Sequence, residues 1–187
     1  METYACLLRG INVGGNNIIP MAKLQKTFEG LGYQDVKTLI ASGNVVFRTK
    51  PTEMRTLEVR LEKQLATDYK YAAKVVVKSR EEMAAIVAAL PRAWSKPTDA
   101  THRYYVMFLR HTIDNSDVIE TIKPKSGVEW LDYVPGALYW RALKKDLGKS
   151  SVAKMPAKLY ADMTARNWNT TLKLSALVVA QSHLPRA

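Results

Sequence analysis

The stretch TYACLLRGINVGGNNIIPM, residues 3–21, sets the pattern for the first half of the chain. Its apolar beginning, 3–8, predicts a central strand. A loop rich in glycine and asparagine follows. Pro20 then suits the first turn of a helix, in which apolar residues recur at helical spacing from Met21 to Leu31. The stretch therefore predicts a strand, a loop and a helix in that order.

The sequence after this stretch completes one small fold. Three further strands are predicted, at 36–41, 45–49 and 72–78. Thr52 is predicted to cap the helix between the last two of them, and Ser79 with Glu82 forms the pattern of a capping box for a third helix. The order β-α-β-β-α-β is that of the ferredoxin-like plait.

The second half begins the same pattern again. The segment 103–110 is similar to the opening strand, and a short helix is predicted at 114–123. Two strands around Pro135-Gly136 then predict a hairpin. No second copy of the closing strand is recognisable, so the halves are predicted to be a degenerate duplication.

The C-terminal part is predicted to be helical. Its last helix covers about 170–182, with Asn169 or Thr170 as the cap. Its apolar residues are Leu172, Ala176, Leu177 and Val179. The predicted fold is α+β, with two related plait halves and this helical segment. The predicted domains are 1–90, a linker at 91–102, and 103–187.

The charge is strongly positive, with a formal net charge of +11. Residues 122–187 contain eleven Lys or Arg against four acidic residues, an excess of seven positive charges. Such an excess favours polyanionic partners, above all nucleic acid or another phosphate-bearing ligand. The alternative is a lysine-rich surface that only keeps the protein in solution.

The composition also limits the chemistry. Cys6 is the only cysteine and lies in the first strand, which predicts a buried structural thiol. The three histidines show no metal-ligand spacing, so neither a metal nor a cofactor is expected. The longest apolar run, 176–180, is far too short for a membrane span, which takes about 20 residues. With no signal-like beginning, a cytoplasmic location and no membrane partner are expected.

Chain topology predicts where a site would form. In a right-handed β-α-β crossover the first two strands run parallel, so the loop after one and the turn after the other lie at the same end of the sheet. The first helix also starts there, and its free backbone amides favour an anion. The predicted binding residues are Arg9, Gly10, Asn12, Gly14, Gly15, Asn16, Asn17, Ser42, Gly43 and Asn44. The alternative is that they only form turns.

Two segments of the second half are further candidates. Gly148-Lys149-Ser150 is not a Walker A loop, because Leu143 stands where that motif needs glycine. Lys149 and Ser150 are still predicted as an anion contact, with a solvated loop as the alternative. Arg166, Asn167 and Trp168 are predicted to join the site, although Trp168 also suits an anchor in the core.

Three stretches together resemble the domain of unknown function 1697 family. They are LLRGINVGGNNIIPM (7–21), ASGNVVFRT (41–49) and TARNWNT (164–170). The resemblance implies an α/β plait related to the ferredoxin-like arrangement, in agreement with the strand order. It implies no activity, substrate or catalytic residue. The family's last motif usually reads TTRNWNT, and Ala165 replaces its second threonine here.

Three functional hypotheses remain open. The first is a binding protein for nucleic acid or a nucleotide. The second is an enzyme for a small anionic substrate, with Arg9 and Arg166 as clamps. The third is an interaction module, a homodimer for example, that uses the aromatic residues of the second half. These aromatic residues are Tyr104, Tyr105, Trp130, Tyr133, Tyr139 and Trp140, which suit either a core or the stacking of bases.

Overall fold

The structure is a computed structural model that describes residues 1–15, 17–91, 94 and 100–182. It forms two compact units, which are described one at a time. The first comprises Met1–Met83 and Lys173–Ala187, and the second comprises Ala84–Leu172. The dividing points fall inside helix α3 (Arg80–Ala88) and inside helix α6 (Trp168–Ser182), so each of these helices contributes residues to both units.

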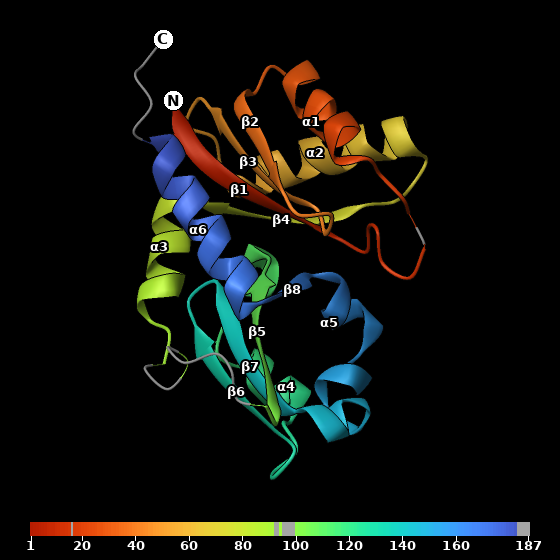
Figure 1. Cartoon of the computed structure of the whole chain (residues 1–187), viewed down its shortest axis with the longest axis vertical. Coiled ribbons are helices and arrows are strands. Elements are labelled where there is room, and N and C mark those ends of the chain that lie inside the picture. Colours follow the sequence, from red (N-terminus) through yellow and green to blue (C-terminus); the bar gives the residue numbers. More distant parts are fainter. Residues whose placement is uncertain (16, 92–93, 95–99, 183–187) are drawn as a thin grey trace. The chain divides into compact units, whose positions relative to one another are not determined.

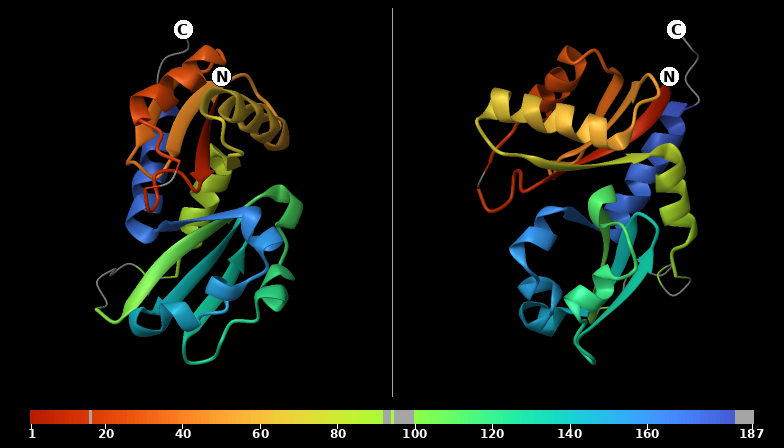
Figure 2. Two further views of the ribbon diagram at one scale, coloured as in Figure 1. Left: turned by 90° about the vertical axis from the view of Figure 1, so that its right-hand side faces the viewer. Right: turned by 180° about the vertical axis from the view of Figure 1, so that it is seen from behind.

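The first unit has a four-stranded antiparallel sheet in the order β2-β3-β1-β4 (Figure 1). Its strands are β1 (Glu2–Arg9), β2 (Gln34–Leu39), β3 (Asn44–Thr49) and β4 (Lys74–Ser79). Helices α1 (Met21–Gly30) and α2 (Met54–Tyr69) lie over one face of this sheet (Figure 2). The predicted ferredoxin-like order of elements is confirmed.

The core of the first unit follows from alternation along the strands. Cys6 and Leu8 of β1 and Phe47 of β3 point toward α1 and α2, and all three are buried. Phe47 stacks on Tyr33 with ring centroids 4.5 Å apart. Cys6 is buried and in no disulfide, as predicted. A buried Phe47 cannot stack on RNA bases in the manner of an RNA-recognition sheet.

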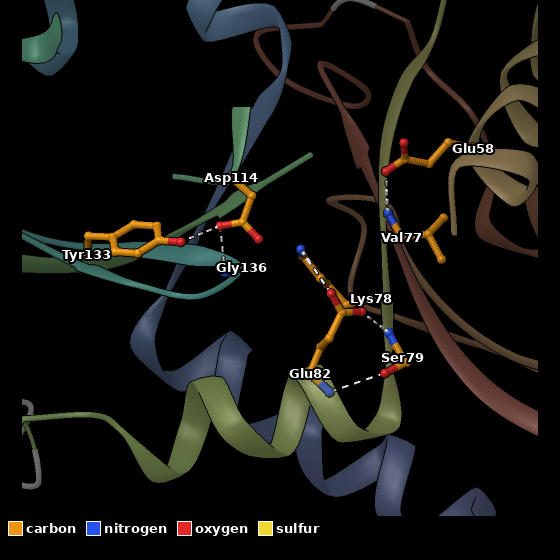
Figure 3. Close-up of polar contacts among 8 residues, drawn as sticks. All are labelled: Glu58, Val77, Lys78, Ser79, Glu82, Asp114, Tyr133 and Gly136. Carbon is orange, nitrogen blue, oxygen red and sulfur yellow. Dashed lines mark hydrogen bonds and ion pairs between the residues drawn. The ribbon is translucent and has the colours of Figure 1, made fainter. Parts of the chain in front are cut away.

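The opposite face of the first sheet carries buried charges. Lys78 of β4 is fully buried, and its Nζ lies 3.4 Å from a carboxylate oxygen of Glu82. Glu82 also accepts a hydrogen bond from the Ser79 backbone N–H (2.8 Å), while Ser79 Oγ accepts one from the Glu82 N–H (3.2 Å) (Figure 3). The predicted capping box is confirmed, and it also supplies the counter-ion of a buried lysine.

The second unit repeats the sheet, in the order β6-β7-β5-β8. Its strands are β5 (His102–Leu109), β6 (Glu129–Val134), β7 (Ala137–Leu143) and β8 (Met163–Asn167). The prediction that no closing strand is present was wrong, because β8 pairs with β5 as β4 pairs with β1. The five-residue strand MTARN is short and half polar, so it lacks the run of valines that marks β4.

Short helices cover one face of the second sheet. They are α4 (Val118–Ile122), α5 (Ala157–Ala161) and the 3-10 helices η2 (His111–Ile113), η3 (Lys144–Lys149) and η4 (Val152–Lys154). The predicted hairpin of β6 and β7 is present. Asp114 holds its turn by accepting hydrogen bonds from the Gly136 N–H (2.8 Å) and the Tyr133 hydroxyl (3.1 Å) (Figure 3).

One local prediction needs correction here, the cap of the helix that follows β3. Helix α2 begins at Met54, and the Thr52 hydroxyl donates to the carbonyl of Lys50 instead of capping the helix. In α6, Leu172 and Val179 are exposed, whereas Leu174 and Val178 are buried. The apolar residues of α6 occur nearly all round the helix, so the sequence does not select its buried face. None of the described helices is long and apolar enough to cross a membrane.

Candidate functional site

The loop after β1 and the turn after β2 meet at one end of the first sheet. Both β1 and β2 run antiparallel to β3, so they run parallel to each other, as the crossover argument requires. The Leu8 N–H donates to the Gly43 carbonyl over 2.8 Å. The loop and the turn are therefore neighbours, although about thirty positions separate them in the sequence.

Asn12 fastens the loop to the turn. Its side-chain oxygen accepts from the Ile19 N–H (2.8 Å), and its Nδ2 donates to the carbonyls of Ile19 (3.0 Å) and Ala41 (2.7 Å). Its φ of 53° lies in the left-handed region that asparagine tolerates. Asn17 closes the loop, because its Nδ2 donates to the Gly10 carbonyl over 2.9 Å. These side chains tie the two ends of the loop to each other and to the turn.

The turn is held in a similar way. Asn44 is fully buried, and its Nδ2 donates to the Leu39 carbonyl (3.0 Å) and to Ser42 Oγ (3.1 Å). Gly43 has a φ of 73°, and a Cβ there would lie 2.7 Å from Ile11 Cδ1. The Ser-Gly-Asn signal thus reflects a turn that packs closely against the loop.

Cationic residues border this end of the sheet. Arg9 ends β1 in register with Lys74, the first residue of β4. The Tyr71 hydroxyl donates to the Arg9 carbonyl, and burial raises the pKa of Tyr71 while the charge of Arg9 opposes that rise. Lys74 pairs with Glu62 over 3.2 Å at an exposed position. Arg9 itself is half-buried.

The exposed part of the loop is mostly backbone. Gly14 and Gly15 are exposed with φ values of 58° and 79°, and a Cβ on Gly15 would meet no atom within 4 Å. Asn16, a predicted binding residue, lies outside the described residues. The apolar side chains of Val13 and Ile18 are also exposed. The loop therefore presents glycine backbone beside Arg9.

The other predicted residues belong to the second unit. Lys149 is fully exposed and pairs with Asp146 over 2.8 Å, which raises the pKa of Lys149 and lowers that of Asp146. Ser150 is buried, and its Oγ accepts from the Ala153 N–H over 3.1 Å at the start of η4. Ser150 thus has a structural contact that the sequence interpretation did not include.

Arg166, Asn167 and Trp168 join β8 to α6. Arg166 is buried, and its guanidinium donates to Thr164 Oγ1 and the Ala165 carbonyl, each over 2.8 Å. Asn167 Oδ1 accepts from the Thr170 N–H over 2.8 Å. The predicted cap at Asn169 or Thr170 was therefore wrong, because Asn167 is the residue that caps α6. The ring of Trp168 lies edge-on to that of Trp94.

Glu129 and Arg141 of the second unit were not predicted. Glu129 is buried and accepts from Trp140 Nε1 (2.9 Å) and from the backbone N–H of Ser151 (2.5 Å), so it fastens a loop to the sheet. Arg141 lies over the ring of Trp130. The sequence signal for this contact is the placement of the two residues opposite each other across the β6–β7 hairpin.

No group of three or more metal-ligating side chains occurs among the described residues. The geometry near the Gly10–Asn17 loop offers hydrogen-bond donors and positive charge. Such groups bind an anion without any acid–base group.

Comparisons with known proteins agree with the fold. No curated protein matches the sequence. The conserved bacterial protein SP0830 from Streptococcus pneumoniae is similar, with a TM-score of 0.80 and 28% identity over 95% of this chain and 98% of that one. The small subunit of acetolactate synthase from Thermotoga maritima matches 89% of this chain and 97% of that one, at 15% identity. Its TM-score of 0.23 is too low to indicate a shared fold.

The family comparison covers most of the chain. The family of proteins of unknown function DUF1697 matches residues 1–139, which include the loop and the turn described above. The TARNWNT segment at 164–170 lies beyond the matched residues. With the strand order of the first unit and the match over 1–139, the chain belongs to the DUF1697 family.

Proposed function

We propose that the Gly10–Asn17 loop of the first unit binds a phosphate-bearing ligand, either nucleic acid or a nucleotide. The observation that carries the proposal is the fastening of the loop by Asn12, whose side chain makes three hydrogen bonds to Ile19 and Ala41. A loop whose ends are already held by hydrogen bonds loses less conformational entropy when it binds. Its exposed glycine backbone can then approach an anion closely.

Charge supports the same proposal. Arg9 adjoins the loop and Lys74 lies in register with Arg9 on the next strand. A guanidinium donates two parallel hydrogen bonds to phosphate oxygens, which suits recognition more than catalysis. The net charge of +11 adds a long-range attraction for polyanions. We propose the cytoplasm as the compartment, where a cysteine outside any disulfide, such as Cys6, stays reduced.

The test distinguishes the contribution of positive charge to binding from the contribution of the hydrogen bonds that hold the loop. Binding of a labelled single-stranded RNA, a labelled duplex DNA and adenosine monophosphate is measured over a series of salt concentrations. For a nucleic acid, Arg9→Ala should weaken binding and reduce the slope of log K against log salt by about one, because one phosphate contact is lost. Asn12→Ala should weaken binding with the slope unchanged, because it loosens the loop and removes no charge.

The matched control is Arg55→Ala. Arg55 is an exposed arginine of α2 in the same unit and lies outside the loop. This variant should bind as the unchanged protein does. An Arg9→Ala variant with the same affinity and salt slope as Arg55→Ala would contradict the proposal, as would the absence of binding to all three probes at low salt.

A further inference from the structure

A pocket of the second unit contains Arg141, whose buried Nε has no hydrogen-bond partner among the described residues. The pocket has a volume of about 370 Å³, within the range of small-molecule sites. Its walls include two tryptophans, two prolines and a leucine, and its polar side chains include Arg141 and Asp132. The lining residues that the structure describes all belong to 84–172, the second unit.

Arg141 is placed by strand pairing. It lies on β7 directly opposite Trp130 of β6, and its guanidinium carbon lies 4.0 Å from the centroid of the Trp130 ring. Its Nε is buried and has no hydrogen-bond partner among the residues that the structure describes. Asp132 lines the same pocket, but the ion pairs of the described residues do not include one between Asp132 and Arg141.

A buried N–H of a charged side chain is energetically unfavourable when it makes no hydrogen bond. A bound acceptor would remove this cost. Arg166 of the same sheet shows the contrast, because its guanidinium donates to two protein oxygens. Arg141 instead rests on an aromatic ring, which leaves its planar edge for a carboxylate or a phosphate. Stacking on Trp130 also fixes the direction of that edge in advance.

The aromatic surface indicates the rest of the ligand. Trp130 keeps 39% of its surface exposed, and the His102 ring lies 5.6 Å from it. An exposed tryptophan ring beside an arginine favours a flat partner that can stack. Pro91, Pro124 and Leu131 add apolar wall without hydrogen-bonding side chains.

We propose that this pocket binds a small planar organic anion, with its ring against Trp130 and the apolar wall and its carboxylate or phosphate on Arg141. The site is separate from the Gly10–Asn17 loop and does not rest on the function proposed for that loop. The carboxylate and phosphate forms share the same chemistry, and the probes below distinguish them.

The test uses benzoate, phenyl phosphate and the uncharged benzamide as probes. Each is titrated into the full chain while the tryptophan indole N–H resonances are followed by nuclear magnetic resonance, with the Trp130 signal assigned from Trp130→Phe. Benzoate, phenyl phosphate or both should shift the Trp130 resonance. The probe that binds with the higher affinity identifies the preferred anion. Benzamide should bind at least about tenfold more weakly, because it lacks the charge that strengthens the hydrogen bonds.

The variants assign the binding to its residues. Arg141→Gln should weaken anion binding at least about tenfold, because the charged donor is lost. Trp130→Leu should weaken the binding of all three probes, followed in that variant at the indole N–H of Trp94, which lines the same pocket. Arg103→Gln is the matched control, since Arg103 is an exposed arginine of β5 outside the pocket lining. Near-ultraviolet circular dichroism checks that each variant is folded. Equal binding of benzoate and benzamide, an unaffected Arg141→Gln variant, or no shift with any probe up to its solubility limit would each overturn the proposal.

Discussion

At Gly43 the backbone leaves little room for a side chain. A Cβ there would lie 2.7 Å from Ile11 Cδ1 and 2.9 Å from Leu8 Cβ, and the φ of 73° is itself unfavourable for other residues. Gly15 has a similar φ of 79°, but a Cβ would meet nothing within 4 Å. Substitutions at these two glycines therefore distinguish the cost of backbone strain from the cost of steric overlap.

We expect Gly43→Ala to reduce the free energy of unfolding by about 2–4 kcal/mol, because strain and overlap add. Gly15→Ala should lose only the strain, about 1 kcal/mol. Urea unfolding followed by circular dichroism measures both. Equal losses in the two variants would show that the Gly43 contacts relax at no cost.

At the scale of elements, α6 depends on the cap supplied by the end of β8. Asn167→Ala should reduce the free energy of unfolding by about 1 kcal/mol, because the Thr170 N–H loses its acceptor. Asn167→Ser should recover most of that loss, since serine also caps helices. Asn169→Ala is the control, because Asn169 is exposed and lies after the cap. Thermal unfolding of the three variants compares them, and an Asn169→Ala loss as large as that of Asn167→Ala would contradict the assignment.

The elements that the sequence predicts well are those marked by more than one signal. The strand over 3–8 is apolar and precedes a glycine loop, and the capping box joins Ser79 and Glu82 by their spacing alone. Strand β8 is not predicted from the sequence, because MTARN forms a strand through its pairing with β5 rather than through its own composition. Tertiary pairing of this kind overrides local propensity.

The candidate site is predicted only as a location. Strand direction brings the loop to the turn, and the contact of Asn12 with Ala41 agrees with it. The sequence does not reveal that Asn12, Asn17 and Asn44 direct their amides at backbone carbonyls, because that depends on the shape of the loop. Nor does it distinguish Arg166, which has protein partners, from Arg141, whose Nε has none among the described residues.

At the scale of the whole molecule, each unit contains a buried tyrosine that makes the stability of the fold depend on alkaline pH. Burial raises the pKa of Tyr4 in the first unit and of Tyr139 in the second from 10.0 to about 12, and a hydrogen bond with Glu2 adds to the rise for Tyr4. The folded chain thus keeps these protons at a pH where the unfolded chain has released them. The contribution of these tyrosines to the free energy of unfolding is fully present below pH 10.0 and is lost as the pH rises toward about 12.

We therefore expect the free energy of unfolding to decline steadily over this alkaline range, as measured by urea titrations at several pH values. Tyr139→Phe should show a shallower decline, because it removes one of the tyrosines whose pKa is raised most. Tyr160→Phe is the control, since Tyr160 is an exposed tyrosine of the second unit. A decline that is identical in Tyr139→Phe and the unchanged chain would contradict the role assigned to Tyr139.

The division of the first unit between Met1–Met83 and Lys173–Ala187 also orders events during synthesis. A ribosome makes the strands of the first sheet early, but Leu174, Val178 and Gln181 of α6 are added only after the whole second unit. Gln181, whose Nε2 donates to the Asp35 carbonyl over 2.6 Å, is among the last described residues to emerge. The first unit therefore cannot complete its packing until α6 has been made, although all four strands of its sheet are synthesised before the second unit.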